Sequence, residues 1–204
     1  MSAPPRLVLA TRNPHKVGEL QEILTAAGVA VDLVMLPDNA PEVVEDGMTF
    51  EDNALKKARS ATEATGLPAV ADDSGLCVDA LNGMPGVLSA RWAGSHGDDA
   101  ANLRLVLDQC SAVPDVMRGA MFVCAAALAL PTGDEHVVVG RLVGSLIREP
   151  RGTGGFGYDP AFLPEGEWRT TAEMSAEEKN AISHRGNAFR ALAPAIQQMV
   201  QPPA

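Results

Sequence analysis

Short apolar runs alternate with helical segments along the first third of this chain, and this alternation restricts the possible folds more than any other feature of the sequence. The runs that read as buried strands are residues 6–10, 31–36 and 67–71, and the segments between them read as helices at 14–27 and 49–65. Thr49 suits the N-cap of the second helix, and Gly66 suits its C-terminal stop. The pattern indicates an α/β fold.

The rest of the chain adds a hairpin and further helices. Asp98 opens a helix that extends to residue 110, and two apolar strands, 120–130 and 136–147, are joined by the turn sequence PTGDE. Residues 149–166 are rich in glycine and proline, and we expect no regular element there. Ser175 and Glu178 form a capping box ahead of a closing helix at 183–200, which Pro194 is expected to bend. A mixed sheet with flanking helices follows.

Length and composition limit the classes of protein. With 204 residues, 46% of them hydrophobic, the chain is expected to form a single domain, 1–204, in which two lobes share a core. A net charge of −10 argues against a general nucleic-acid or membrane binder. We expect no signal peptide, and the apolar run at 121–131 is too short to cross a bilayer. Three widely spaced cysteines favour a cytoplasmic location.

One glycine motif is misleading. Residues 152–157, GTGGFG, satisfy the dinucleotide-binding pattern G-x-G-x-x-G, which works only where a helix begins and its N-terminus faces the pyrophosphate. Here Tyr158, Asp159 and Pro160 follow, so no helix begins in register and the NAD interpretation fails. Phe156 and Tyr158 leave open a stacking surface for a base, and the alternative is an ordinary turn.

Two adjacent aspartates, Asp72 and Asp73, interrupt the apolar run AVADDSGLCVDAL. A buried carboxylate is unfavourable unless it is paired or binds a metal, and two neighbours repel each other. We expect both at the C-terminal end of a strand, where α/β proteins bind ligands, and where hard carboxylates suit Mg²⁺. The alternative is a DDSG turn with both carboxylates in water.

Two further segments suit an anionic ligand. TRNPHK, residues 11–16, places a loop between a strand and a helix start, with Lys16 in the first turn; it is not a Walker A loop. Lys179, His184 and Arg185 bring cationic groups together in an acidic chain. An ordinary turn and a solvated basic face are the alternatives, and no G-x-S-x-G elbow supports a serine hydrolase. Together these segments indicate a site for a phosphorylated nucleotide.

Six stretches now identify a family: LVLATRNPHKVGEL, TFEDNALKKA, ADDSGLCVDAL, PGVLSARWAG, REPRGTGGFGYDPAF and EEKNAISHRGNAF. With these stretches in this order, the sequence resembles the bacterial inosine/xanthosine triphosphate pyrophosphatases, which remove non-canonical purine nucleotides. The resemblance implies an elongated two-lobed fold with a central cleft, a homodimer, and Mg²⁺-dependent hydrolysis of ITP, dITP and XTP to the monophosphate and pyrophosphate.

The resemblance also implies roles for individual residues. It makes Asp73 the proton acceptor and a metal ligand, with Glu45 as the second acidic ligand; Asp46 and Glu42 are the alternatives to Glu45. Asp52 stands where the family usually has the longer Glu. The residues implied to contact the substrate are Thr11, Arg12, Asn13, Pro14, His15, Lys16, Ser74, Phe156, Gly157, Tyr158, Asp159, Lys179, His184 and Arg185.

The base is expected to be read through its 6-oxo group. Donors from Arg185, and from His184 or nearby backbone N–H groups, would favour an oxygen at this position over the amino group of adenine, with Phe156 stacked on the purine. Two other functions stay open at this point. One is a related pyrophosphatase with a different base preference, and the other is a nucleotide-binding protein without catalytic activity.

Overall fold

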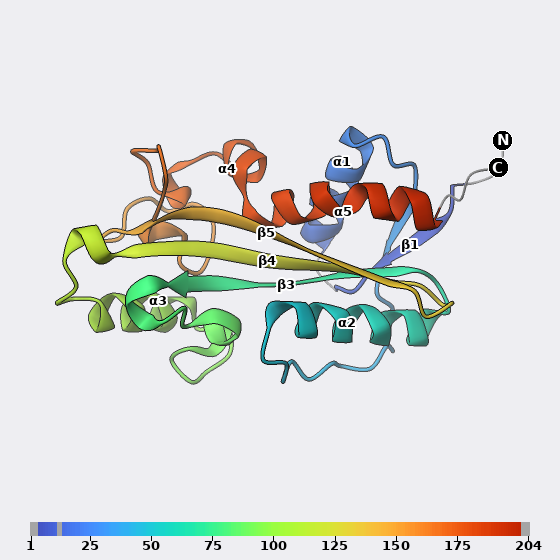
Figure 1. Ribbon diagram of the computed structural model, residues 1–204, viewed down its shortest axis with the longest axis horizontal. Coiled ribbons are helices and arrows are strands. Elements are labelled where there is room, and N and C mark those ends of the chain that lie inside the picture. The colour runs from blue at the N-terminus through green and yellow to red at the C-terminus, as the bar shows by residue number, and fades with distance from the viewer. Residues whose placement is uncertain (1–3, 12–13, 201–204) are drawn as a thin grey trace. The chain divides into compact units, whose positions relative to one another are not determined.

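The computed structural model of the chain describes residues 4–11 and 14–200 (Figure 1). The chain divides into two compact units, each with its own hydrophobic core. The first unit contains Met1–Asp73, Cys124–Gly140 and Arg185–Ala204, and the second contains Ser74–Val123 and Arg141–His184. The expectation of a single domain with two lobes stays a prediction.

A mixed sheet confirms the predicted fold class. Its strands are β1 (Arg6–Leu9), β2 (Asp32–Met35), β3 (Ala69–Val78), β4 (Gly119–Ala129), β5 (Glu135–Leu146) and β6 (Phe162–Pro164), in the order β2-β1-β3-β4-β5-β6. Strand β1 pairs in parallel with β2 and β3, whereas β6 pairs antiparallel with β5. The strand–helix–strand alternation at the start of the chain therefore produces the parallel part of the sheet.

Three helices flank the sheet in the first unit: α1 (Pro14–Ala26), α2 (Phe50–Thr65) and α5 (His184–Val200). Figure 1 shows α1 and α5 on one face of the sheet and α2 on the opposite face. Leu20 and Leu24 of α1, like Leu192 and Ile196 of α5, are four residues apart, so each pair lies on one side of its helix. All four are buried in one core cluster, which fixes both helices on the sheet.

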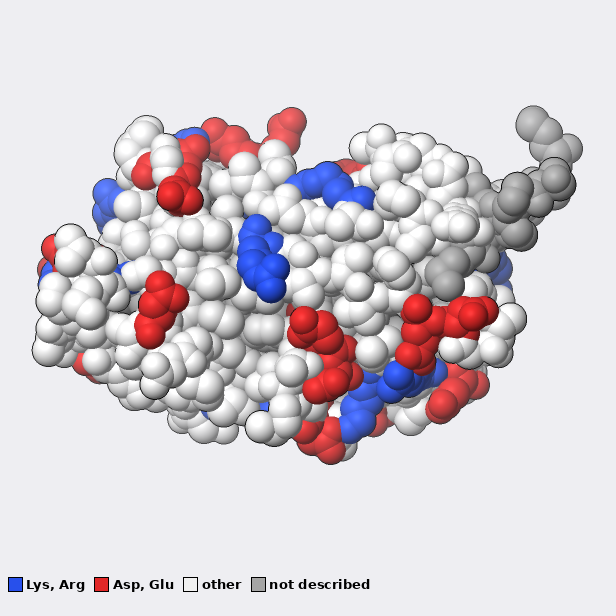
Figure 2. All heavy atoms as spheres, in the orientation of Figure 1, with Lys and Arg blue, Asp and Glu red and all other residues white. Residues whose placement is uncertain are grey.

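Helix α2 has one buried side and one charged side. Its predicted caps are confirmed: Thr49 accepts a hydrogen bond from the backbone N–H of Asp52, and Gly66 adopts a left-handed φ of 68°. Acidic and basic side chains lie next to each other over α2 (Figure 2), and the ion pairs Lys56–Asp46 and Arg59–Glu135 occur on this helix. Its outer face is therefore locally neutralised.

The second unit contains the helices α3 (Asp99–Gln109) and α4 (Ala176–Ile182) and the 3-10 helices η1 (Asp79–Leu81), η2 (Gly86–Arg91), η3 (Asp115–Met117), η4 (Asp159–Ala161) and η5 (Thr171–Glu173). The predicted cap at Asp98 and the capping box of Ser175 and Glu178 are confirmed. Leu76, Phe122 and Phe162 belong to the core of this unit. Among the residues that the structure describes, no helix has the length and apolar character needed to cross a membrane.

One expectation about the later part of the chain is wrong. Residues 149–166 do contain regular structure, η4 and β6, because the fully buried ring of Phe162 anchors a short edge strand against β5. The closing helix predicted at 183–200 is confirmed as α5, and Ser183, with extended backbone, separates it from the short helix α4. Pro194 lies inside this helix, and the bend expected there stays a prediction.

Candidate active site

The aspartate pair lies in the middle of β3, so the expected position at the end of a strand is wrong. The pairing of β3 with β1 ends at Val70 and Leu9, and β3 then continues through Asp72 and Asp73 to Val78. The solvated DDSG turn is wrong for the same reason. The carboxylates do follow the carboxyl end of the parallel partner β1, which is where α/β sheets place ligands.

Asp72 is stabilised by basic side chains on one face of the sheet. Its side chain is 7% exposed, and Arg185 donates hydrogen bonds to its Oδ2 from Nε at 3.0 Å and from Nη2 at 2.8 Å. The Nζ atom of Lys16 lies 4.0 Å from Asp72 Oδ1. Burial raises the pKa of Asp72, but the charges of Arg185 and Lys16 outweigh burial and hold this pKa well below its usual range. Asp72 is therefore ionised and paired.

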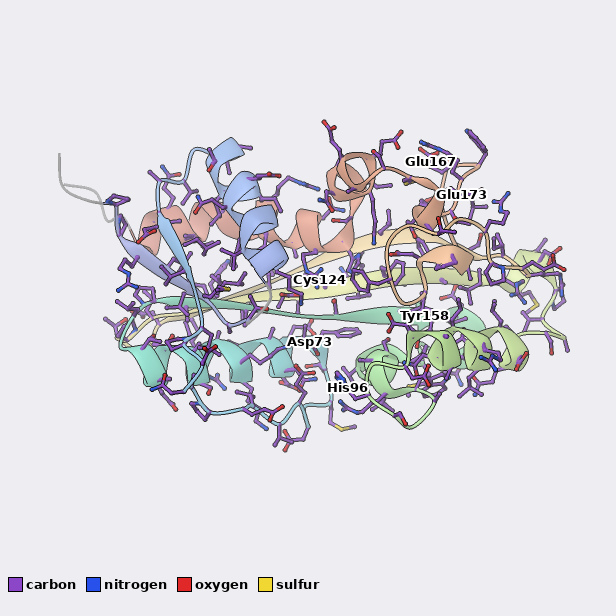
Figure 3. All side chains as sticks on the ribbon, turned by 180° about the vertical axis from the view of Figure 1, so that it is seen from behind. Asp73, His96, Cys124, Tyr158, Glu167 and Glu173 are labelled. Atoms are coloured by element: carbon purple, nitrogen blue, oxygen red, sulfur yellow. The ribbon has the colours of Figure 1, made fainter. Side chains whose placement is uncertain are left out.

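Asp73 points to the other face of the sheet, toward α2 (Figure 3), because neighbouring side chains of a strand point in opposite directions. Asn53 Nδ2 donates to Asp73 Oδ2 at 2.9 Å, and Lys57 Nζ lies 3.4 Å from Asp73 Oδ1. Burial raises the pKa of the Asp73 carboxyl group, and Lys57 opposes this effect only in part. The two aspartates thus have different partners and opposite pKa shifts.

Asn53 and Lys57 contact Asp73, and the analysis of the sequence did not single them out. They are four residues apart on α2, so both project toward the same side of the helix. Lys57 also donates to Glu45 Oε1 at 2.8 Å, so one ammonium group contacts two carboxylates. Burial lowers the pKa of Lys57, but the charges of Asp73 and Glu45 outweigh burial and raise it overall. Glu45, Asn53, Lys57 and Asp73 are called the Asp73 cluster below.

The Asp73 cluster fits a hard divalent cation. Asp73 and Glu45 offer carboxylate oxygens, and both already approach one positive charge, the Lys57 ammonium. Of the two alternatives to Glu45, Asp46 forms an ion pair with Lys56. We assign no role to Glu42. Asp52 is exposed in the first turn of α2. The described residues contain no group of three or more His, Cys, Asp or Glu side chains suited to a metal, but Mg²⁺ needs few protein ligands.

The predicted phosphate loop is described only in part. Helix α1 begins at Pro14, as expected for proline in a first turn, and the strand before it ends at Leu9. Arg12 and Asn13 lie outside the described residues, as do the side chains of Pro14 and His15. Lys16 is described, and its side chain is 34% exposed beside Asp72.

The second unit contains a pocket that brings together seven of the predicted residues. These are Ser74, Phe156, Gly157, Tyr158, Asp159, Lys179 and His184. Residues that the analysis of the sequence did not single out also line it, among them Ser89, Asp99 and Phe122. We call it the aromatic pocket. Arg185, the other expected base-reading residue, belongs to the first unit and is paired with Asp72.

Buried Asp159 shapes the glycine loop of the aromatic pocket. It accepts hydrogen bonds from the Phe156 N–H at 2.8 Å and from Thr171 Oγ1 at 2.9 Å, and it pairs with Lys179. Gly155 has a φ of +69° and no room for a Cβ beside the Asp159 carboxylate. The glycines therefore allow a tight turn around Asp159, and no α-helix follows, which confirms that the NAD interpretation fails.

The aromatic residues of the pocket differ in their exposure and in their partners. Phe156 is 65% exposed, and Lys179 Nζ lies 4.8 Å from the centroid of its ring. His184 stacks on buried Phe122 with 4.9 Å between ring centroids and 15° between planes. Tyr158 is different: burial raises the pKa of its hydroxyl group, which donates to the Ser89 carbonyl at 2.8 Å. Tyr158 supports the wall, whereas Phe156 presents an open ring face.

Comparison with known proteins covers nearly the whole chain. The Ham1 family model matches residues 7–195. The chain is 62% identical over 197 residues to the dITP/XTP pyrophosphatase of Streptomyces coelicolor, which covers 96% of this chain and 98% of that protein.

Solved structures agree with this result. The nucleoside-triphosphatase / dITP/XTP pyrophosphatase of Mycobacterium abscessus is 57% identical, with a TM-score of 0.78 and coverage of 93% of this chain and 97% of that one. A HAM1 protein from Coxiella burnetii is 42% identical, with a TM-score of 0.88 and coverage of 95% and 99%. These matches confirm the resemblance inferred from the six stretches, and the chain belongs to the Ham1 family.

Proposed function

We propose that this protein hydrolyses the non-canonical purine nucleotides dITP, XTP and ITP to the nucleoside monophosphate and pyrophosphate. The names of its relatives, dITP/XTP pyrophosphatases that match over nearly the full chain, support this assignment. The observation that carries the chemistry is the Asp73 cluster, in which the largely buried carboxylate of Asp73 and that of Glu45 both approach the ammonium group of Lys57.

Asp73 is the proposed proton acceptor. Water cleaves the anhydride bond between the α- and β-phosphates, its proton passes to a carboxylate oxygen of Asp73, and pyrophosphate leaves. A carboxyl group whose pKa is raised by burial is a stronger base than an ordinary aspartate, which suits this role. Asn53 and Lys57 hold the carboxylate in place through its two oxygens.

Glu45 and Asp73 are the residues that would hold Mg²⁺. Their hard oxygen atoms fit the preference of this ion, which keeps water and substrate phosphates as its other ligands. When bound, Mg²⁺ supplies neutralisation of the phosphate charge.

Lys16 and the start of α1 are proposed to hold the phosphates. Backbone N–H groups in the first turn of a helix have no partner within the helix and favour anions. Lys16 lies in this first turn and adds a positive charge that is one-third exposed.

The aromatic pocket is proposed to bind the base. The open ring of Phe156 offers a stacking face, and Lys179 and His184 place polar nitrogen atoms at the same pocket. A 6-oxo group accepts hydrogen bonds, and the amino group of adenine does not. Arg185 stays a predicted donor to the base, although its pairing with Asp72 also gives it a structural role.

We further propose that the protein is a homodimer in the cytoplasm. The family resemblance supports the dimer, and three free cysteines suit a reducing compartment. Sedimentation velocity at micromolar concentration tests the dimer, because a monomer sediments with the mass of one 21.3 kDa chain.

Product analysis tests the enzymatic proposal. The protein is incubated with dITP, XTP, ITP, dATP and dGTP, with and without Mg²⁺, and the products are separated by ion exchange. We expect monophosphate and pyrophosphate from the first three, only with Mg²⁺, and far slower reaction of the last two. Release of orthophosphate would contradict the proposed bond cleavage, and binding without hydrolysis would identify a nucleotide sensor.

A further inference from the structure

Asn53 connects two segments of the first unit that each supply a carboxylate to the Asp73 cluster. The residue is completely buried, and both ends of its amide are used. Its Nδ2 donates to Asp73 Oδ2 at 2.9 Å, and its Oδ1 accepts from the backbone N–H of Gly47 at 2.8 Å. One planar group therefore contacts strand β3 and the loop before α2 at once.

Gly47 brings the loop close enough for this contact. A Cβ added to Gly47 would lie 2.6 Å from Asn53 Oδ1 and 2.8 Å from the Cβ of Asp52, which is closer than real Cβ atoms approach. Only glycine therefore fits against the first turn of α2 without a shift of the loop or the helix. Glu45 lies two residues earlier on the same loop, so the Gly47 contact also limits where Glu45 can lie.

We propose that Asn53 is a positioning residue that sets the separation between Glu45 and Asp73. It acts through the two carboxylates, by its hydrogen bond to Asp73 and by its contact with the loop that carries Glu45. The inference rests on the proposed function, because Glu45 and Asp73 are the proposed cation ligands. Groups that orient the ligands of a metal affect its affinity by roughly 10–100-fold when they are removed.

The identity of the side chain matters as much as its size. Asn53→Asp keeps an acceptor for the Gly47 N–H but replaces the donor to Asp73 with a second carboxylate oxygen, and two like charges at this distance repel. Gly47→Ala keeps the donor to Asp73 and displaces the loop instead. The two variants thus damage opposite ends of the same connection.

A buried asparagine in the second unit provides the matched control. Asn102 is 1% exposed, and its Oδ1 accepts a hydrogen bond from the Ala93 N–H at 2.7 Å. Asn102→Ala therefore removes a buried polar side chain and a loop contact, as Asn53→Ala does, without touching the Asp73 cluster. If Asn53 only stabilised the fold, both variants would behave alike.

The test measures Mn²⁺ binding to the full-length protein by electron paramagnetic resonance, without nucleotide. We expect the Kd for Mn²⁺ to rise by about 10-fold or more in Asn53→Ala, and to stay within about twofold of wild type in Asn102→Ala. Amide hydrogen exchange at Gly47 is expected to accelerate in Asn53→Ala. The double variant with Gly47→Ala and Asn53→Ala is expected to bind Mn²⁺ no more weakly than the weaker-binding single variant. Should Asn53→Ala fail to fold, Gly47→Ala makes the same test from the loop.

An unchanged Kd in folded Asn53→Ala, or an equal loss in Asn102→Ala, would overturn the inference. Hydrolysis of dITP by the wild type is measured in parallel. If the wild type hydrolyses dITP while Asn53→Ala binds Mn²⁺ normally, the inference fails and the proposed function stands. If the wild type binds Mn²⁺ but releases no pyrophosphate, the proposed function fails while the binding data decide the role of Asn53.

Discussion

Replacement of Arg185 is expected to destabilise the protein by leaving Asp72 buried beside a weaker partner. The Asp72 side chain is 7% exposed, and Arg185 donates two hydrogen bonds to one of its oxygens. Removing one member of a buried ion pair costs about 3–5 kcal/mol, because the other charge stays without compensation. Lys16, 4.0 Å from the carboxylate, retains part of that compensation. We therefore expect Arg185→Met to lower the free energy of unfolding by about 3 kcal/mol.

A second substitution separates the charge effect from a loss of packing. Asp72→Asn in the Arg185→Met background removes the uncompensated charge, so the double variant is expected to be more stable than Arg185→Met alone. Urea unfolding at pH 7, followed by circular dichroism, gives the free energies for the wild type, both single variants and the double variant. A double variant that is less stable than Arg185→Met would refute the reasoning.

The same pair predicts how stability changes with pH. The folded pKa of Asp72 lies below its unfolded value, so this group stabilises the wild type above pH about 4 and loses its contribution as the pH falls through the folded pKa. Without Arg185, burial raises the pKa of Asp72, and protonation removes the uncompensated charge. The stability difference between wild type and Arg185→Met should therefore shrink from pH 7 toward pH 3; a constant difference would contradict the ion-pair explanation.

Three other experiments test the phosphate site, the base site and the burial of two cysteines. Lys16→Ala is expected to weaken binding of the triphosphate much more than that of the monophosphate product in calorimetry, and equal losses would place Lys16 away from the outer phosphates. Phe156→Ala is expected to raise the KM for dITP by about 5- to 100-fold through lost stacking, with little loss of stability because its ring is exposed; an unchanged KM would remove Phe156 from base binding. Burial raises the pKa of the Cys110 and Cys124 thiols, so alkylation of the native protein at pH 8 is expected to reach both only on unfolding, and rapid labelling of either would contradict their burial.

The parts of the fold that depend on local chemistry could be predicted from the sequence. Thr49, Asp98 and Ser175 cap the helices that follow them, and Gly66 ends α2 in a left-handed conformation. Each of these signals involves residues within one helical turn of one another. The short strand β6 could not be predicted in this way, because its pairing with β5 and the burial of Phe162 depend on distant parts of the chain.

The contacts of the candidate site also depend on residues that are far apart in the sequence, and local patterns do not predict them. Asp72 is tolerated inside a strand because Arg185, 113 residues away in the chain, donates to it, and no local pattern contains that contact. The sequence motif TFEDNALKKA contains Asn53 and Lys57, whose spacing of four residues on a capped helix indicates a shared face. This face contacts the carboxylate of Asp73, and that contact depends on how α2 packs against the sheet.

The most direct test of the central claim compares wild type and Asp73→Asn in the hydrolysis of dITP. The substitution keeps the size of the side chain and removes its negative charge, and Asn53 and Lys57 stay as neighbours. We expect Mg²⁺-dependent release of pyrophosphate by the wild type and a kcat at least about 100-fold lower in a folded Asp73→Asn protein. Turnover by Asp73→Asn close to that of the wild type would contradict this claim.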